Sequence, residues 1–324
     1  MAGQRTVGEV GERALLTRFA RAARAAPSAL VGPGDDAAVI APGATVLSVD
    51  TAVQGRHFRV EWSSPAQIGS RAVTAAAADI AAMGARPTGV LVSLAAPVSA
   101  PVALVEGINT GVVERAAALG AAVLGGDLVE AGEIAVSITA VGVLDDEPPI
   151  LLSGARPGDV LAVSGPLGAS AAGYALISGD SEITGDAADE VLAAFRSPAP
   201  DLTQGPVAAR HGASALTDVS DGLVEELRLM SAASGVVVDV DSAAVPITEA
   251  TRRVARALGA DVVSWALTGG EDHELLGAFA DRGSVPPGWT VIGGVSGPVG
   301  DVDKAADAVR IDGEPATVHG WHSL

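Results

Sequence analysis

Apolar side chains recur with alternating helical and strand spacing along most of the first half of the chain. Helical spacing covers 7–26, and two short β-like runs, 37–40 and 46–53, follow a Gly/Pro turn. Ser63 or Ser64 before Pro65 predicts the start of an Ala-rich helix that reaches Met83, because a hydroxyl caps the first turn and proline fits there. The remaining predicted elements of this half are a strand at 89–94, a helix at 102–119, and strands at 122–124 and 134–144.

A second series of alternating elements follows the acidic, proline-rich segment 145–149, which we interpret as a linker. It comprises a strand at 159–164, helices at 169–177, 187–195, 204–211 and 221–233, and strands at 236–240, 273–279, 290–292 and 309–311, with Asp312-Gly313 as a hairpin turn. Helices and strands alternate in both halves. This predicts an α/β or α+β protein with two domains, 1–149 and 150–324.

Charge and hydropathy limit the classes of partner. The chain has 324 residues, of which 39 are acidic and 20 basic, so its formal net charge is −19. Such a charge repels nucleic acid and anionic lipid, and we predict neither as a partner. The longest uncharged run, 87–105, is interrupted by Pro97 and Pro101, which favours a buried strand and a helix start over a membrane span.

Several kinds of chemistry are excluded by residues that the chain lacks. There is no cysteine, hence no disulfide, thiolate metal site or cysteine nucleophile, and the first thirty residues lack the pattern of a secretory signal. We expect a cytoplasmic protein. The chain has one lysine, Lys304, and no Gly-Lys-Ser/Thr phosphate loop or Gly-x-Gly-x-x-Gly after a strand. Any phosphate chemistry must therefore use arginine, backbone amides or metal ions.

Aspartates beside glycine or at the ends of predicted strands are the candidate chemical groups. They occur in Gly34-Asp35-Asp36, Ser48-Val49-Asp50-Thr51, Ala78-Asp79-Ile80, Gly125-Gly126-Asp127 and Asp218-Val219-Ser220-Asp221-Gly222. Mg²⁺ is typically held by a few such carboxylates together with substrate phosphates. One Gly-Asp pair alone is more often a turn. Asp79 lies in the apolar run 75–83, where an unpaired buried carboxylate is costly, so it needs a partner.

Three of these motifs have a purely structural alternative. Asp79 could be a helix cap or a buried, hydrogen-bonded carboxylate. Ser220 or Asp221 precedes a predicted helix and could cap it, although the same helix start could receive a phosphate or a hydrated ion. Gly125-Gly126 follows a predicted strand and is either a plain turn or a place where the backbone approaches phosphates closely.

Taken in order, the motifs resemble those of the thiamine-monophosphate kinase family in the aminoimidazole-ribonucleotide-synthetase superfamily. Besides the aspartate motifs, the matching stretches are Gly55-Arg56-His57-Phe58, Gly154-Ala155-Arg156-Pro157-Gly158-Asp159 and Gly269-Gly270-Glu271-Asp272-His273-Glu274-Leu275. Together they span nearly the whole chain. The resemblance implies an aminoimidazole-ribonucleotide-synthetase-like architecture: an N-terminal mixed αβ domain that binds ATP and Mg²⁺ and forms a homodimer, and a C-terminal αβ domain.

The implied activity is ATP-dependent phosphorylation of thiamine monophosphate to thiamine diphosphate with several Mg²⁺ ions. By motif, the implied metal ligands are Asp36, Ser48, Asp50, Thr51, Asp79, Asp127, Asp218 and Asp221, of which Asp50, Asp127 and Asp218 are the predicted catalytic residues. Gly126, Asp127 and Ser220 would contact ATP. His57, Glu271 and Trp321 would contact thiamine monophosphate, although His57 alone fits a surface or core imidazole equally well, and Trp321 a core anchor.

The chain departs from the family pattern at three positions. Val49 stands where the family often has threonine, so only its backbone carbonyl remains for a metal. Leu152 occupies a place where an arginine commonly approaches ATP, and His273 replaces the usual tyrosine.

The mechanism predicted from this resemblance is direct in-line phosphoryl transfer. The acceptor is itself a phosphate monoester with a second pKa of about 6, so it is largely ionised at neutral pH and needs no general base. The alternatives are another ATP-dependent enzyme of the superfamily, such as an amidine-forming ribonucleotide synthetase, and a non-catalytic module that binds Mg²⁺ or nucleotide.

Overall fold

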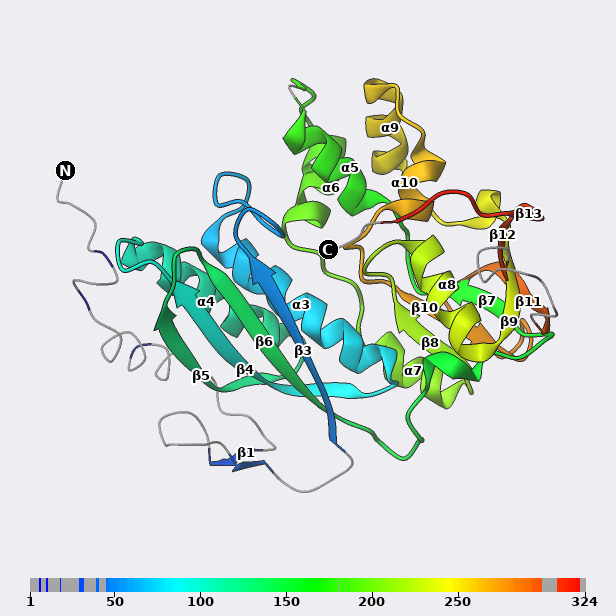
Figure 1. The fold of residues 1–324 in the computed structure, drawn as a ribbon, viewed down its shortest axis with the longest axis horizontal. Coiled ribbons are helices and arrows are strands. Elements are labelled where there is room, and N and C mark those ends of the chain that lie inside the picture. The colour runs from blue at the N-terminus through cyan, green and yellow to red at the C-terminus, as the bar shows by residue number, and fades with distance from the viewer. Residues whose placement is uncertain are drawn as a thin grey trace. The chain divides into compact units, whose positions relative to one another are not determined.

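The computed structural model describes residues 6, 10, 18, 29–31, 39–40, 45–179, 181–298 and 308–320 (Figure 1). Contacts divide the chain into two compact units, one formed by Met1–Ile80 and Arg86–Leu144, the other by Ala81–Ala85 and Asp145–Leu324. Most of the predicted helix 7–26, together with Asp36 and Trp321, lies outside the described residues.

The first unit is built on a four-stranded sheet in the order β3-β6-β4-β5. These strands are β3 (Thr45–Val53), β6 (Ala135–Val143), β4 (Arg86–Ala96) and β5 (Ala122–Glu130). β6 pairs antiparallel with both β3 and β4, whereas β5 pairs parallel with β4. A parallel pair needs a crossover connection, which α4 (Val102–Ala118) supplies. A separate pair of short strands, β1 (Ala29–Val31) and β2 (Val39–Ile40), precedes the sheet.

Helices α3 (Pro65–Ala82) and α4 cover one face of this sheet (Figure 1). The side chains beneath them, among them Val92 and Ile138, are buried. The predicted start of α3 is confirmed at Ser64: its hydroxyl accepts from the Gln67 N–H, and its own N–H donates to the Gln67 side chain. This reciprocal pair satisfies two of the backbone donors that a helix start leaves unpaired.

The opposite face of the sheet carries exposed apolar side chains. Leu47 and Val49 on β3 are 66% and 65% exposed, and Leu91 and Val129 on neighbouring strands are 40% and 44% exposed. Alternation along each strand places them together on the face that α3 and α4 do not cover. A broad apolar surface of this kind is typical of an interaction face.

The second unit is built on a seven-stranded sheet in the order β13-β12-β9-β11-β7-β10-β8. The strands are β7 (Val160–Val163), β8 (Ala215–Asp218), β9 (Val236–Val240), β10 (Leu275–Phe279), β11 (Thr290–Pro298), β12 (Val309–Ile311) and β13 (Glu314–Pro315). β12 pairs parallel with β9, and the other pairs are antiparallel. The buried face of α8 (Leu223–Ser234) contributes Leu223, Leu227 and Met230 to the main core of this unit.

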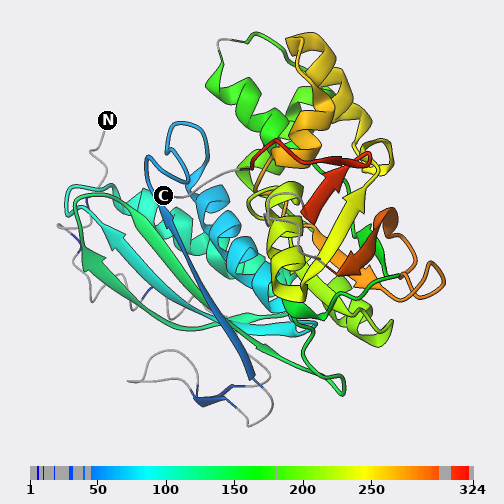
Figure 2. The ribbon, with the colours of Figure 1, turned by 45° about the vertical axis from the view of Figure 1, so that its right-hand side comes forward.

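Four helices of the second unit form a smaller group beside the sheet (Figure 1): α5 (Ala169–Ser178), α6 (Asp186–Arg196), α9 (Glu249–Leu258) and α10 (Val262–Thr268). Helix α7 (Gln204–Arg210) lies apart from this group, near β8 and β10 (Figure 2). The unit also has two short 3-10 turns, η1 (Leu152–Gly154) and η2 (Ser242–Ala244). A second core cluster, including Leu176, Val191 and Val254, joins α5, α6 and α9. No helix in the described part of the chain is long and apolar enough to cross a membrane.

The mixed α/β fold class is confirmed, but several elements differ from prediction. β5 continues to Glu130, so the interpretation of Gly125-Gly126 as a turn is wrong: both glycines lie inside the strand. The structure adds β8, α9 and α10, which the spacing did not predict. The hairpin turn at Asp312-Gly313 is confirmed, with φ of 54° and 83°.

Candidate functional site

In the first unit, the structure brings together Ser48 and Asp79, which were predicted as metal ligands from separate motifs. The Ser48 hydroxyl on β3 donates to Asp79 Oδ2 on α3 at 2.5 Å. Ser48 lies on the helix-covered face of the sheet, and both side chains are half-buried. This contact supplies the partner that Asp79 requires in its apolar surroundings.

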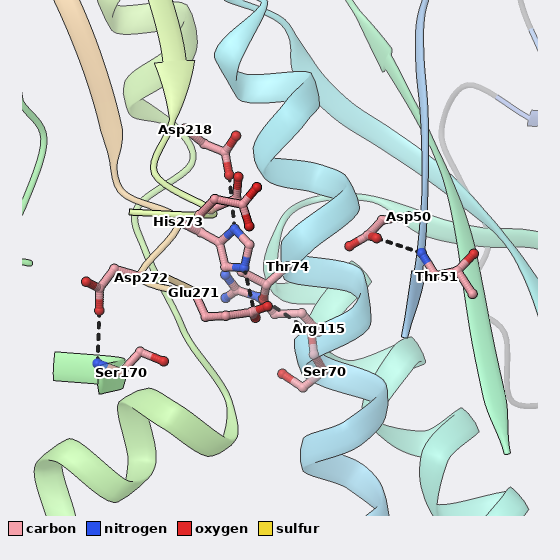
Figure 3. A network of polar contacts seen from close by, with 12 residues as sticks. Asp50, Thr51, Ser70, Thr74, Arg115, Ser170, Asp218, Glu271, Asp272 and His273 are labelled. Carbon is pink, nitrogen blue, oxygen red and sulfur yellow. Dashed lines mark hydrogen bonds and ion pairs between the residues drawn. The ribbon is translucent and has the colours of Figure 1, made fainter. Parts of the chain in front are cut away.

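Asp50 lies two residues along β3 from Ser48 and therefore on the same face of the sheet. Its carboxylate is exposed, accepts a hydrogen bond from the Thr51 N–H at 2.6 Å, and is directed from β3 toward the side of α3 (Figure 3). Ser48, Asp50 and Asp79 thus form an oxygen-rich group where β3 faces α3.

Asp127 and Thr51 lie elsewhere on the sheet. The register places Thr51, Ser137, Ser93 and Asp127 in one row across the four strands, next to the row that contains Asp50. Adjacent rows face opposite sides, and three strand spacings of about 4.8 Å separate β3 from β5. Thr51 Oγ1 is 2.7 Å from Ser137 Oγ, and Asp127 Oδ1 accepts from the Leu128 N–H. The sheet therefore does not bring Asp127 to Asp50 directly.

Gly126 is fixed by packing against β4. A Cβ atom at this position would lie 2.4 Å from the Val92 carbonyl oxygen, which excludes any side chain. The residue is exposed on its other side, so the backbone of β5 remains accessible there. This position is compatible with the interpretation that the backbone at Gly126 approaches phosphates closely.

His57 closes a turn after β3. Its Nδ1 accepts a hydrogen bond from the Val53 N–H at 3.0 Å, while its own N–H donates to the Val53 carbonyl at 2.9 Å. A neutral imidazole that accepts through Nδ1 carries its proton on Nε2. The turn thus leaves His57 an Nε2–H donor for a ligand.

In the second unit, two predicted motifs that lie some fifty residues apart form one pair of loops. β8 and β10 are antiparallel neighbours, so Asp218–Gly222 and Gly269–Leu275 meet at the same end of the sheet. Backbone bonds join them: Glu271 N–H to the Ser220 carbonyl at 2.7 Å and His273 N–H to the Val219 carbonyl at 2.9 Å. Glu271 and His273 both adopt positive φ, 67° and 56°, which is costly outside glycine and clusters at functional sites.

A buried histidine links the carboxylates of these loops (Figure 3). His273 Nδ1 is 3.0 Å from Asp218 Oδ2, and its Nε2 is 3.4 Å from Glu271 Oε2. Burial disfavours the charged imidazole, but the hydrogen bonds and negative charges of Asp218 and Glu271 outweigh it and raise the pKa of His273 to about 10. The replacement of the family's tyrosine thus places a cation between a predicted metal ligand and a predicted substrate contact.

Glu226 on α8 belongs to the same site and was not predicted from the sequence. Its Oε1 accepts from the Ser220 hydroxyl and from the Asp221 N–H, both at 3.1 Å, and its side chain is buried. Burial, with the nearby charges of Asp218 and Asp221, raises the pKa of Glu226 to about 7. Neither Ser220 nor Asp221 caps α8, because the N-cap is Gly222.

Asp272, between Glu271 and His273, turns away from them and binds a helix start. Its two carboxylate oxygens accept from the Gly168 N–H at 2.6 Å and the Ser170 N–H at 3.0 Å, at the start of α5. Figure 3 shows the bond from Ser170. Burial raises the pKa of Asp272 to about 6. The carboxylate satisfies backbone donors that the helix start leaves unpaired and so anchors the loop that carries Glu271.

Leu152, which stands where the family commonly has an arginine, packs against the main core of the second unit. Its carbonyl accepts from the Ser234 hydroxyl at 3.1 Å. The residue is thus part of the apolar packing around η1 and offers no cation to a phosphate.

The candidate metal ligands in the two units, Ser48, Asp50 and Asp79 in the first and the Asp218 loop in the second, suit a hard cation. They are carboxylate and hydroxyl oxygens, the ligands that Mg²⁺ prefers, and no cysteine competes. Among the residues that the structure describes, no three acidic or histidine side chains converge on one point. An ion bound at either group would therefore complete its shell with water or phosphate oxygens, as Mg²⁺ usually does.

Comparisons with known proteins show the family and the fold of the chain. Residues 34–144 match the family model of the AIR synthase related protein N-terminal domain, and residues 156–298 match that of the C-terminal domain. Thiamine-monophosphate kinase of Mycobacterium tuberculosis is 44% identical over 323 residues, covering 98% of this chain and 93% of the relative.

Two solved structures share the fold over most of their length. Thiamine monophosphate kinase from Aquifex aeolicus has a TM-score of 0.76 at 28% identity, covering 84% of this chain and 88% of that one. A structure described as AaThiL complexed with AMPPCP and TMP has a TM-score of 0.79 at 25% identity and covers 99% of both chains.

Proposed function

The chain belongs to the thiamine-monophosphate kinase family of AIR synthase related proteins, and from this premise we propose that it phosphorylates thiamine monophosphate by direct transfer from ATP. The product is thiamine diphosphate. One observation carries the proposal beyond family membership: the paired loops 218–222 and 269–274 present Asp218, Ser220 and Glu271 together at one end of the β8–β10 pair.

In the first unit, Ser48, Asp50 and Asp79 would hold Mg²⁺, together with Asp36. Bound Mg²⁺ would neutralise charge on the phosphate oxygens, which this chain cannot do with a phosphate-loop lysine. The contact between Ser48 and Asp79 keeps both oxygens oriented toward the same space. Asp127 on β5 and Thr51 on β3 lie at opposite edges of the sheet, so each would contact a separate ion, and Gly126 would let ATP approach the β5 backbone.

In the second unit, the loop pair holds the charged groups in fixed positions. His273 orients Asp218, a proposed metal ligand, and Glu271, a proposed contact of the acceptor. Glu226 fixes the Ser220 hydroxyl and the Asp221 backbone, so that Ser220 and Asp221 face ATP and metal in one conformation. Preorganised charge of this kind is the main contribution that a protein makes to phosphoryl transfer.

No general base is required for the transfer. The acceptor oxygen belongs to a phosphate monoester that is largely ionised at neutral pH, so no proton has to leave before attack. The β–γ bond of ATP breaks while the bond to the acceptor phosphate forms, and ADP departs. In-line geometry follows from attack opposite the leaving oxygen. The proposed reaction has no covalent phosphoenzyme intermediate.

We further propose that the protein is a homodimer through the open face of the first-unit sheet. Leu47, Val49, Leu91 and Val129 expose a large apolar surface there, and a second copy would bury it symmetrically.

The acceptor is tested by steady-state assays of the purified protein with ATP and Mg²⁺. Thiamine monophosphate should yield thiamine diphosphate and ADP in equal amounts. Formylglycinamidine ribonucleotide, the acceptor expected of an amidine-forming relative, should give no ADP above background. Turnover with the ribonucleotide alone, or ATP binding without ADP release with either acceptor, would refute the proposal.

A further inference from the structure

The loop 271–274 directs alternate side chains to opposite sides. Its first and third side chains face the Asp218 loop, as described above, whereas the second and fourth, Asp272 and Glu274, face the segment 164–170, which joins β7 to α5. Figure 3 shows Asp272 turned away from the site, toward the start of α5. The side chains that the proposed function uses thus lie on one side of the loop, and two further carboxylates hold its other side.

Asp272 is buried, and its carboxylate binds the backbone at the start of α5. Both of its oxygens are occupied, one by the Gly168 N–H at 2.6 Å and the other by the Ser170 N–H at 3.0 Å. Packing fixes the position of Gly168, since its φ is 86° and a Cβ atom there would lie 2.9 Å from the Ala266 backbone nitrogen. Asp272 therefore cannot shift without leaving buried backbone donors unpaired.

Glu274 holds the end of the loop through contacts of its own. Its Oε2 accepts from the Ser164 hydroxyl at 2.6 Å, and the Ser164 oxygen in turn accepts from the Leu275 N–H at 2.8 Å. The carboxylate lies against Gly165, where a Cβ atom would be 2.5 Å from either of its oxygens. The Glu274 carbonyl accepts from the Val219 N–H at 2.8 Å. The end of the loop is thus held independently of Asp272.

The backbone on both sides of Asp272 is strained. Glu271 and His273 adopt φ of 67° and 56°, in the left-handed region that is costly for residues other than glycine. Such conformations persist only where surrounding contacts over-determine them. His273 is also held by burial and by Asp218, since its side chain is 4% exposed against 36% for Glu271. Loss of the two bonds to Asp272 should therefore displace Glu271 more than His273.

We propose that Asp272 is a positioning residue for the acceptor: by tying the loop to the start of α5, it holds Glu271 in the strained conformation in which Glu271 contacts thiamine monophosphate. This inference rests on the proposed function, in which Glu271 contacts the acceptor. Asp272 itself touches none of the reacting groups, because its carboxylate is directed to the far side of the loop.

The effect belongs to the acceptor because the proposed ATP contact of this unit is fixed by a different residue. The Ser220 hydroxyl donates to Glu226 at 3.1 Å, and Glu226 belongs to α8. A displaced Glu271 therefore weakens the binding of thiamine monophosphate while Ser220 keeps its place. A general loss of stability would instead reduce the fraction of active protein, which lowers the apparent kcat and leaves both KM values unchanged.

Two variants loosen the contact from its two sides, and each has a matched control. Asp272→Asn replaces one accepting oxygen with an NH2 group that meets an N–H donor, whereas Gly168→Ala displaces the donors and leaves the sequence 271–274 unchanged. The controls lie at the start of α6: Asp186→Asn changes an exposed acid, and Gly185→Ala changes a glycine of positive φ with nothing within 4 Å. We expect both test variants to raise KM for thiamine monophosphate about tenfold, as for the loss of one hydrogen bond to a charged group, while KM for ATP changes less than about twofold. Both controls should match the wild type in both KM values.

A double variant shows whether Asp272 acts through Glu271. Glu271→Gln should by itself raise KM for thiamine monophosphate, and adding Asp272→Asn should cause no further rise, since effects that pass through one contact are not additive. Equal changes in the KM of both substrates, or a full additional rise in the double variant, would overturn the inference.

The proposed function and this inference fail in distinguishable ways. A wild-type chain that forms no thiamine diphosphate refutes the function and the inference with it. A wild-type chain that forms thiamine diphosphate, with Asp272→Asn folded by circular dichroism and unchanged in KM, refutes the inference alone. Should Asp272→Asn fail to fold, Gly168→Ala decides the question by the same measurement.

Discussion

Asp272 shows that neighbouring residues of one motif have different roles. Glu271 and His273 face the Asp218 loop, whereas Asp272 points the other way and accepts from two backbone N–H groups at the start of α5. Glu271 and His273 have left-handed backbone conformations on either side of Asp272. Asp272 therefore fixes the loop from behind while its neighbours are presented in front.

Asp272→Ala should destabilise the protein by about 1–3 kcal/mol, because the Gly168 and Ser170 N–H groups would be left buried without an acceptor. Urea unfolding followed by circular dichroism measures this difference. Asp186→Ala, at the exposed first turn of α6, is the matched control and should cost less than about 0.5 kcal/mol. Equal losses in the two variants would show that Asp272 is not an anchor.

Asp50→Asn should reduce turnover by about 100-fold or more while the fold survives, since an amide cannot supply a carboxylate's charge to a divalent cation. Asp50 is exposed on β3, so the substitution leaves the core unchanged. Initial rates with thiamine monophosphate at saturating Mg²⁺ measure the effect. Asp146→Asn, in the exposed segment after β6, should keep the wild-type rate. A near-normal rate for Asp50→Asn would remove this residue from the site.

The individual residues of the site were predictable from the sequence only where their surroundings were unusual. Asp79 was predicted to need a partner because it is a carboxylate within an apolar run, and in the structure that partner is Ser48. The same argument applies to Glu226, an acid between the buried Leu223 and Leu227, but Glu225 and Glu226 together match the ordinary pattern of an acidic first helical turn, so Glu226 was not singled out.

At the level of secondary structure, the first-unit sheet has one face covered by α3 and α4 and one face that exposes Leu47 and Val49. Val49→Asp should convert the proposed homodimer to a monomer, because a charge buried at the centre of an apolar interface is not compensated. Light scattering coupled to size-exclusion chromatography measures the mass. Val98→Asp, in the exposed turn before α4, is the control and should remain dimeric. A wild-type chain that is monomeric at micromolar concentration would contradict the proposed interface.

Long elements without internal glycine interruptions were predicted well, whereas short elements were missed and the glycine-containing strands β5 and β11 were predicted too short, β11 at 290–292 instead of Thr290–Pro298. α3, α4 and β6 follow their apolar spacing closely. β5 was predicted too short because glycine weakens strand propensity, whereas here Gly126 is required by contact with Val92 on β4. α9 was missed although Thr248 caps its start and Gly259 ends it, which are signals present in the sequence. β8, with four residues, is too short to show a period.

Across the molecule, buried acids make stability depend on pH. Burial, together with the charges of Asp272 and Asp201, raises the pKa of Glu274 to about 7 although its bond from Ser164 opposes the rise. The Glu274 carboxyl group therefore binds its proton more tightly in the folded state than in the unfolded state. The contribution of Glu274 to the free energy of unfolding is fully present below about pH 4.5 and is lost as the pH rises through about 7.

Glu274→Gln should accordingly raise the free energy of unfolding at pH 8 by roughly 1–3 kcal/mol and change it little at pH 4.5. Glutamine still accepts the Ser164 hydrogen bond, so the charge is the main difference. Thermal unfolding at the two pH values measures it, and the exposed Glu182→Gln is the control. A gain of the same size at both pH values would show that ionisation of Glu274 is not the cause.

The proposed function depends on direct transfer of a phosphoryl group from ATP to thiamine monophosphate. A single-turnover experiment with γ-labelled ATP, excess protein, Mg²⁺ and thiamine monophosphate, quenched over milliseconds to seconds, tests this most directly. We predict that label moves from ATP to thiamine diphosphate with one rate and is never found on the protein. Label that first appears on the protein and then passes into product, or that is released only as inorganic phosphate, would contradict the account.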